Sequence, residues 1–270
     1  MSASDPPGFL DLPSRSAQPR TSGLTHVLDT GLPAEALRAL LDTIGTFTDF
    51  WKFGFGIAYL DPALPAKLTL LKEHGITACV GGTLLEIAWL QGKAEQCLAW
   101  AAESGFSCIE VSNGAVAMDR EEKRRLITRG TADFTVVSEV GSKDPSAPVK
   151  PEAWCDEMLG DLDAGAAFSL AEGRASGMVG LYESDGSVRD DVVELLVSTV
   201  GSEQIIFETP LHRQQSWFVR RLGAEVNLGN VAASEVLALE ALRLGLRADT
   251  LHGAPAPSAT SPSRDEDGTR

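Results

Sequence analysis

The chain has 270 residues, of which 43% are hydrophobic, and a formal net charge of −15 at pH 7. This length supports one large hydrophobic core or two small ones, and the acidic balance argues against a general surface for nucleic acid or anionic membranes. No apolar stretch approaches the roughly 18 residues of a membrane-spanning helix. The N-terminus lacks the apolar centre of a secretory signal, so we expect a cytoplasmic location.

The two ends of the chain differ in composition from its middle. Residues 1–20 and 253–270 are rich in Pro and Ser and show no periodicity, which predicts two disordered tails around one domain spanning residues 21–252. Four widely spaced cysteines form no CxxC pair, and we interpret them as buried apolar side chains in a reducing compartment: Cys79, Cys97, Cys108 and Cys155.

Short apolar runs alternate with helical patterns between the tails. Strands are predicted near residues 24–29, 49–54, 76–80, 107–111, 134–140, 167–171, 205–208 and 224–228. Helices are predicted at residues 34–44, 84–104, 119–128, 150–164, 190–200 and 232–246. Eight alternations in about 230 residues predict an α/β fold, a single (β/α)8 barrel of the TIM type. An open doubly wound sheet is the competing fold, but the first strand runs into DTGLP instead of a GxGxxG turn.

Each predicted strand stops at a polar residue or a glycine. The carboxyl ends of the strands form the active face of such barrels, so we expect eight charged side chains to converge there: Asp29, Lys52, Glu110, Glu139, Lys143, Glu172, Arg174 and Glu208. Several carboxylates around one cavity repel one another unless cations compensate. An oxygen-rich set without a His or Cys cluster favours Mg²⁺ or Mn²⁺, and the lysines and Arg174 suit a phosphate or carboxylate.

Two glycine-containing turns add a second indication of an anionic ligand. Gly81 and Gly82 stand at a predicted strand-to-helix turn, where free backbone N–H groups could cradle an anion. NLGN follows the last predicted strand, where barrels often hold phosphate, so Asn227, Gly229 and Asn230 are candidates for substrate binding. Together with the cations and the metal set, these turns predict a small phosphorylated acid as the ligand.

Simpler interpretations stand beside several of these residues. Glu208 precedes Thr-Pro and could cap a strand, Asp29 precedes Thr-Gly and could form a turn, and Lys143 could be a solvated loop residue. His26, inside the first predicted strand, is better interpreted as packed than as a base. Exposure of aromatic side chains such as Trp217 would favour self-association, which leaves a homo-oligomer open.

A series of specific motifs runs from Gly23 to Thr250: GLTHVLDTGLP, DFWKFGFG, GITACVGGTLLE, GFSCIEVSNG, SEVGSK, DLDAGA, EGRASG, IIFETP, QQ, VNLGNV and LRLGLRADT. In residue and order, this series resembles the phosphosulfolactate synthase family. The resemblance implies a lyase that requires Mg²⁺ and adds sulfite to phosphoenolpyruvate, giving (R)-2-phospho-3-sulfolactate. That product serves coenzyme M or sulfolactate biosynthesis.

The resemblance also implies roles for individual residues. Lys143 falls on the last lysine of the family motif EVGKK and would be the general acid that protonates C2, with Lys52 and Glu139 as further catalytic groups. The expected metal ligands, or their immediate supports, are Glu110, Glu139 and Glu172. The expected substrate-binding residues are Asp29, Gly81, Gly82, Arg174, Glu208, Asn227, Gly229 and Asn230.

The sequence departs from the family pattern at five positions. The residues that differ are Ser142 in EVGSK, Asn113 in EVSNG, Val80 and Leu85 in VGGTLLE, and Met178 in ASGMVGL. Two lysines are thereby missing near the anion-handling loops. Either other cations such as His212 and Arg213 compensate, or the chemistry has changed. The alternatives are a family member that adds another nucleophile to phosphoenolpyruvate or a related unsaturated acid, and a non-catalytic anion-binding barrel.

Overall fold

A computed structural model describes residues 8–142, 149–174 and 176–251. Eight parallel strands pair in chain order, and the last pairs with the first, so the sheet closes into a barrel. The (β/α)8 prediction is therefore confirmed. The strands are β1 (Thr25–Asp29), β2 (Phe50–Phe53), β3 (Thr77–Val80), β4 (Cys108–Val111), β5 (Thr135–Val140), β6 (Phe168–Ala171), β7 (Ile205–Glu208) and β8 (Leu228–Val231).

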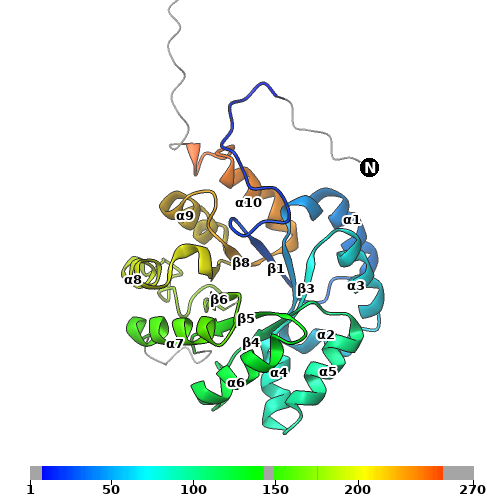
Figure 1. Ribbon diagram of the computed structural model, residues 1–270. Coiled ribbons are helices and arrows are strands. Elements are labelled where there is room, and N and C mark those ends of the chain that lie inside the picture. The colour runs from blue at the N-terminus through cyan, green and yellow to red at the C-terminus, as the bar shows by residue number, and fades with distance from the viewer. Residues whose placement is uncertain (1–7, 143–148, 175, 252–270) are drawn as a thin grey trace, which may run out of the picture.

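Helices surround the barrel as an outer ring (Figure 1). They are α1 (Ala34–Ile44), α2 (Ile57–Leu60), α3 (Leu64–Glu73), α4 (Gly82–Leu90), α5 (Ala94–Ser104), α6 (Arg120–Gly130), α7 (Pro151–Asp163), α8 (Asp190–Val200), α9 (His212–Leu222) and α10 (Val236–Arg243). The sequence patterns did not predict α2 and α3, between β2 and β3, or α9, between β7 and β8.

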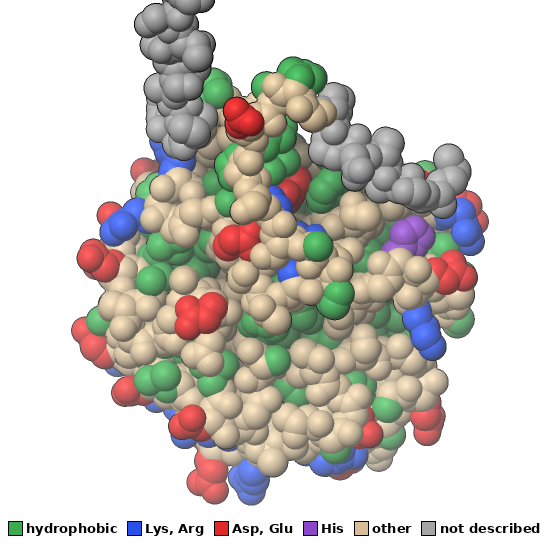
Figure 2. Space-filling view, turned by 45° about the horizontal axis from the view of Figure 1, so that its top comes forward, with side chains coloured by type: hydrophobic (Ala, Val, Ile, Leu, Met, Phe, Trp, Pro, Cys, Tyr) green, Lys and Arg blue, Asp and Glu red, His purple; other side chains and the backbone are tan. Residues whose placement is uncertain are grey.

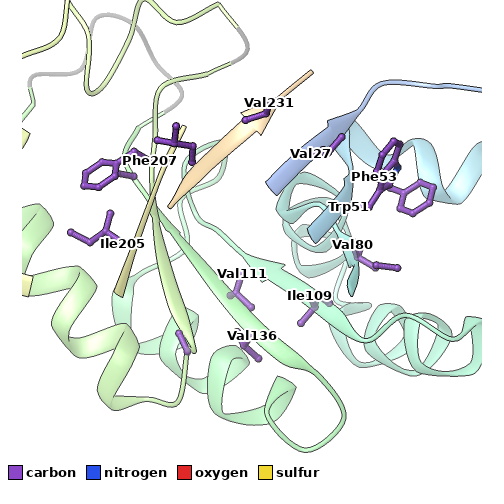
Figure 3. Packing of buried hydrophobic residues seen from close by; sticks show 14 of the residues in the cluster. Val27, Trp51, Phe53, Val80, Ile109, Val111, Val136, Ile205, Phe207 and Val231 are labelled. Atoms are coloured by element: carbon purple, nitrogen blue, oxygen red, sulfur yellow. The ribbon is translucent and has the colours of Figure 1, made fainter. Parts of the chain in front are cut away.

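The alternation of side chains along each strand produces two cores. In β2, Trp51 and Phe53 join the large core between strands and helices, part of which Figure 3 shows. Phe50 belongs instead to a smaller cluster inside the barrel, together with residues such as Val137 and Leu170. Because successive side chains of a strand point to opposite faces, Lys52 lies on the same inner face as Phe50. The inside of the barrel therefore contains this apolar cluster, and polar side chains such as that of Lys52 lie beyond it toward the carboxyl ends of the strands.

Two expected helices have different boundaries. The helix expected over residues 84–104 is divided into α4 and α5, because Gly92 adopts a left-handed backbone with φ 68°. The last expected helix, over 232–246, consists of a 3₁₀ turn at Ala233–Glu235 followed by the shorter α10.

The eighth strand begins four residues later than the predicted residue 224. The Arg243 guanidinium donates to the carbonyl groups of Ala224 and Val226, at 2.5 and 2.7 Å. A side chain from α10 therefore takes acceptors that a strand would need for pairing, and regular pairing starts at Leu228. As a result, most of the NLGN motif lies within β8 and not after it.

Part of the expected N-terminal tail packs against the barrel. Arg15 forms ion pairs with Glu225 and Glu240, at 2.5 and 3.0 Å, and Arg20 pairs with Asp49 at 3.1 Å. Asp49 directly precedes β2 and Glu225 lies three residues before β8, so the segment crosses the amino-terminal end of the barrel. Residues 8–20 of the expected tail thus belong to the described structure, whereas residues 1–7 and 252–270 are outside the described part of the chain.

The surface agrees with the composition. Figure 2 shows acidic and basic side chains interspersed on the face in view, with no continuous basic patch there. Across residues 8–142, 149–174 and 176–251, no helix has the length and apolarity that crossing a membrane would require. All four cysteines are buried and free. Trp217 is partly buried and contacts Phe218, with ring centroids 5.0 Å apart.

Candidate active site

A cavity of about 490 Å³ opens at the carboxyl ends of the strands, and six of the eight expected charged residues line it. Its lining consists of Leu28, Lys52, Gly54, Phe55, Gly81, Gly82, Thr83, Glu110, Ala115, Glu139, Glu172, Arg174, Ser176, Glu208 and Asn230. Lys143 lies outside the described residues, and the Asp29 side chain points to the outer side of the barrel, between the strands and the helices. The sequence thus predicted most of the charged lining.

Lys52 supplies a buried positive charge to this cavity. Its side chain is only 4% exposed, and Nζ donates to Glu110 Oε2 at 2.8 Å and to Glu208 Oε1 at 3.5 Å. Burial by itself would lower the pKa of Lys52, but the carboxylates of Glu110, Glu208 and Glu139 outweigh burial and raise this pKa above its ordinary value. Lys52 therefore stays protonated near neutral pH and contributes a positive charge to the cavity.

Glu110 occupies the position where an external anion was expected. Its Oε1 accepts a hydrogen bond from the Gly82 N–H at 2.8 Å, at the start of α4, while the Gly81 N–H donates to Phe53 O at 3.1 Å. A helix N-terminus favours a negative charge, and here the protein's own carboxylate supplies it. The glycines are needed for close packing, because a Cβ at Gly82 would lie 2.2 Å from Ser112 Oγ. The predicted cradle of free amides is therefore wrong for both glycines.

Glu208 links the lysine to the loop that follows β6. Oε1 accepts from Lys52 and from the side-chain amide of Asn230, and Oε2 accepts from the Gly173 and Arg174 N–H groups, both at 2.9 Å. The Tyr182 hydroxyl donates to the carbonyl group of Glu208. Glu208 is thus more than a strand cap, since it fixes both the cation and the backbone at Arg174.

Glu139 and Glu172 come from the neighbouring strand ends of β5 and β6, and both are buried where they line the cavity. Among the described residues, no three acidic, His or Cys side chains gather into a group that could hold a metal ion. Both carboxylate oxygens of Glu110 accept hydrogen bonds, from Gly82 and Lys52, and Oε1 of Glu172 accepts from the Arg174 N–H at 2.6 Å. Asn230 brings a further acceptor to the cavity: its Oδ1 is buried and has no hydrogen-bond partner in the described structure.

Asp29 forms a turn instead of lining the cavity. Its Oδ1 accepts from the N–H groups of Gly31 and Leu32, both at 2.8 Å, and its Oδ2 accepts from Trp51 Nε1 at 3.1 Å. Lys67, from α3, approaches the same oxygen at 3.5 Å. The structure therefore corrects the expected substrate contact in favour of the turn interpretation.

The later start of β8 explains the positions of three other candidates. Asn227 lies at the amino-terminal end of the barrel, where Oδ1 accepts from Leu24 N at 3.0 Å and Nδ2 donates to Ile205 O at 3.2 Å. Gly229 lies within the barrel, where a Cβ would be 2.8 Å from Ile206 Cγ2. Of the three, Asn230 alone lines the cavity.

His26 is packed inside the barrel, as expected. It is fully buried, and its ring lies 5.9 Å from that of Phe50. Burial, assisted by the positive charge of Lys52, lowers the pKa of His26 well below its ordinary value. The imidazole is therefore neutral near pH 7.

Some lining residues were not expected from the sequence. Phe55, Thr83, Ala115 and Ser176 line the cavity without carrying charge. A signal for Phe55 is its position between two glycines directly after a strand, and its backbone has a positive φ of 54°. The other three carry no local signal of their own.

The chain matches a known protein family over most of its length. The model of the (2R)-phospho-3-sulfolactate synthase (ComA) family matches residues 13–249. The phosphosulfolactate synthase of Methanothermobacter thermautotrophicus is 39% identical over 245 residues, covering 88% of this chain and 95% of that protein. The phosphosulfolactate synthase of Bacillus subtilis is 37% identical over 244 residues, covering 89% and 97%.

Solved structures with the same architecture are much more distant in sequence. The YdjI aldolase from Escherichia coli K12 superposes with a TM-score of 0.53 at 13% identity, covering 81% of this chain and 78% of that one. This likeness concerns the barrel fold alone. The family match spans nearly all of the barrel and includes the strands that carry Lys52, Glu110, Glu139 and Glu208, and it places the chain in the phosphosulfolactate synthase family.

Proposed function

We propose that the chain is a carbon–sulfur lyase that adds sulfite to phosphoenolpyruvate and releases (2R)-2-phospho-3-sulfolactate. The observation that carries this proposal is the buried Lys52 ammonium group, which lies in one cavity with Arg174 and four glutamates in a member of this family. The reaction brings two anions together, and fixed cations lower the electrostatic cost of that step.

The cavity supplies what the addition requires. The sulfur lone pair of sulfite attacks the terminal methylene carbon, and the electron pair of the double bond moves through C2 onto the carboxylate, forming an aci-anion. Lys52 stays protonated and so offers a positive charge that is already in place when this anion develops. Arg174 presents a guanidinium, which matches the geometry of a phosphate or carboxylate.

The proton that completes the reaction must reach C2. Lys52 is a poor donor because its pKa is raised. We assign this step to Lys143, which lies three residues beyond the end of β5, the strand that carries Glu139. The proton passes from the lysine ammonium to C2, and the carboxylate returns to its ordinary form.

The carboxylates that line the cavity suit a divalent cation that would also bind oxygen atoms of the substrate. Mg²⁺ is commonly held by one or two carboxylates together with substrate oxygens and water. Glu139 and Glu172 would supply the carboxylates, and the buried Oδ1 of Asn230 is an additional acceptor. When bound, Mg²⁺ supplies positive charge for the developing carboxylate anion.

The departures from the family pattern leave the cavity lining intact. Val80 and Leu85 are core residues, Met178 is exposed, and Asn113 donates to Met118 O at 3.2 Å. Within the described chain, none of these four residues, nor Ser142, lines the cavity. This supports sulfite and phosphoenolpyruvate as the substrates. The four free thiols support a reducing cytoplasm as the compartment.

The test is turnover by the purified protein. Phosphoenolpyruvate, sulfite and Mg²⁺ are incubated with it, the enol absorbance is followed, and the product is identified by ³¹P NMR. We expect the absorbance to fall only when sulfite is present. Absence of turnover by the folded protein would overturn the proposal, and turnover with another nucleophile alone would replace sulfite as the substrate.

A further inference from the structure

The backbone at Arg174 forms an unusual turn. Its φ of 56° is left-handed, which is uncommon for a residue with a Cβ. Its N–H donates to Glu172 Oε1 at 2.6 Å and to Glu208 Oε2 at 2.9 Å, and its carbonyl accepts from the Gly177 N–H at 3.1 Å. The placement of the guanidinium therefore depends on how this turn is held at its two ends.

Glu172 and Glu208 hold the first end of the turn, and Gln214 holds the second. Gln214 lies in the first turn of α9 and is 1% exposed. Its Nε2 donates to the carbonyl groups of Gly177 and Gly186, at 2.8 and 3.3 Å, while its Oε1 accepts from the Leu211 N–H at 3.2 Å. One buried carboxamide thus joins two points of the loop after β6 to the start of α9.

The loop is shaped for this contact. Gly177 has φ 63°, and a Cβ there would lie 2.7 Å from Gln214 Nε2. The neighbouring Arg213 donates from Nη2 to the Asp185 carbonyl at 2.5 Å. The start of α9 therefore holds the loop that carries Arg174 in place through hydrogen bonds from Arg213 and Gln214.

We propose that Gln214 is a positioning residue for phosphoenolpyruvate binding, acting through Gly177 on Arg174. Gln214 is not among the residues that line the cavity, so its effect on the substrate is transmitted by the turn. The inference rests on the proposed function to the extent that Arg174 binds an anionic group of phosphoenolpyruvate.

The test compares Gln214→Met with Gln215→Met in the full-length protein. Met keeps the side-chain volume of Gln and removes the amide donor. Gln215 is a matched control, because it is also buried in α9 and its Nε2 donates to Thr209 O at 3.1 Å, away from the loop. The dissociation constant for phosphoenolpyruvate without sulfite, KM and kcat are measured for each variant, alone and combined with Arg174→Ala.

Loss of the loop contacts is expected to weaken phosphoenolpyruvate binding and raise its KM about tenfold, with kcat changed less than about threefold, because ground-state and transition-state binding fall together. In the Arg174→Ala background the same substitution should change KM by less than about twofold, since its effect passes through Arg174. Gln215→Met should leave the affinity for phosphoenolpyruvate unchanged.

Two results would overturn the inference: unchanged phosphoenolpyruvate affinity in Gln214→Met, or an equal loss with and without Arg174. If Gln214→Met fails to fold, Gly177→Ala tests the same contact from the loop side and must weaken phosphoenolpyruvate binding. The binding measurement needs no sulfite, so a protein that binds phosphoenolpyruvate through this arrangement but does not react with sulfite refutes the proposed function alone.

Discussion

Replacement of Lys52 by Met removes the only cation that contacts both Glu110 and Glu208 among the described residues. At an effective dielectric constant of about 20, unit charges 2.8 Å apart attract each other by about 6 kcal/mol. Desolvation of the buried groups offsets part of this attraction. Loss of one partner of a buried ion pair typically destabilises a protein by about 3–5 kcal/mol, because the other charge stays buried.

The matched variant combines Lys52→Met with Glu110→Gln. The amide of Gln carries no charge, so urea unfolding should show that the double variant regains much of the stability that the single variant loses. Turnover should stay low in both, by about a hundredfold or more, because the fixed positive charge is absent at the developing anion. Unchanged stability in Lys52→Met, or recovered turnover in the double variant, would refute this account of Lys52.

Further predictions concern the proton donor, the metal and the barrel interior. Lys143→Ala should lower kcat about 10²- to 10⁴-fold, as expected for loss of a general acid, while a titration shows that phosphoenolpyruvate still binds. Treatment with EDTA should abolish turnover and added Mg²⁺ should restore it, and Glu139→Gln or Glu172→Gln should raise the Mg²⁺ concentration that gives half-maximal turnover. The pKa of His26 is lowered by burial, so only the unfolded state gains this proton as the pH falls below about 6.5. Between pH 6.5 and 5.0 this proton uptake should lower the free energy of unfolding of the native protein by about 2 kcal/mol, and the His26→Phe variant should not show this loss. Urea unfolding measures both proteins at the two pH values, and an identical pH dependence would contradict the prediction.

The sequence predicted the barrel and most of its charged lining, because strand ends are visible in local patterns. Lys52, Glu110 and Glu139 each stand at or near the end of an apolar run, and alternation along their strands turns them inward. The same alternation keeps Asp29 out of the cavity lining. Its neighbour Leu28 faces the cavity, so Asp29 points to the outer side of the barrel, a difference of one position that a local pattern did not resolve.

The errors have a common physical origin in contacts from distant parts of the chain. The start of β8 depends on Arg243, which comes from α10 and binds carbonyl groups that precede the strand. The amide of Gly82 is used by Glu110, which lies on the next strand. A glycine turn looks the same in sequence whether its amides bind a substrate or a carboxylate of the protein.

The most direct test of the central claim is a crystal structure of the protein with phosphoenolpyruvate and Mn²⁺, in which anomalous scattering locates the metal. The account predicts phosphoenolpyruvate in the cavity at the carboxyl ends of the strands, with an anionic group on Arg174 and Mn²⁺ between the substrate and the carboxylates of Glu139 and Glu172. Phosphoenolpyruvate bound elsewhere, or Mn²⁺ on Glu110 and Glu208 with Lys52 displaced, would contradict it.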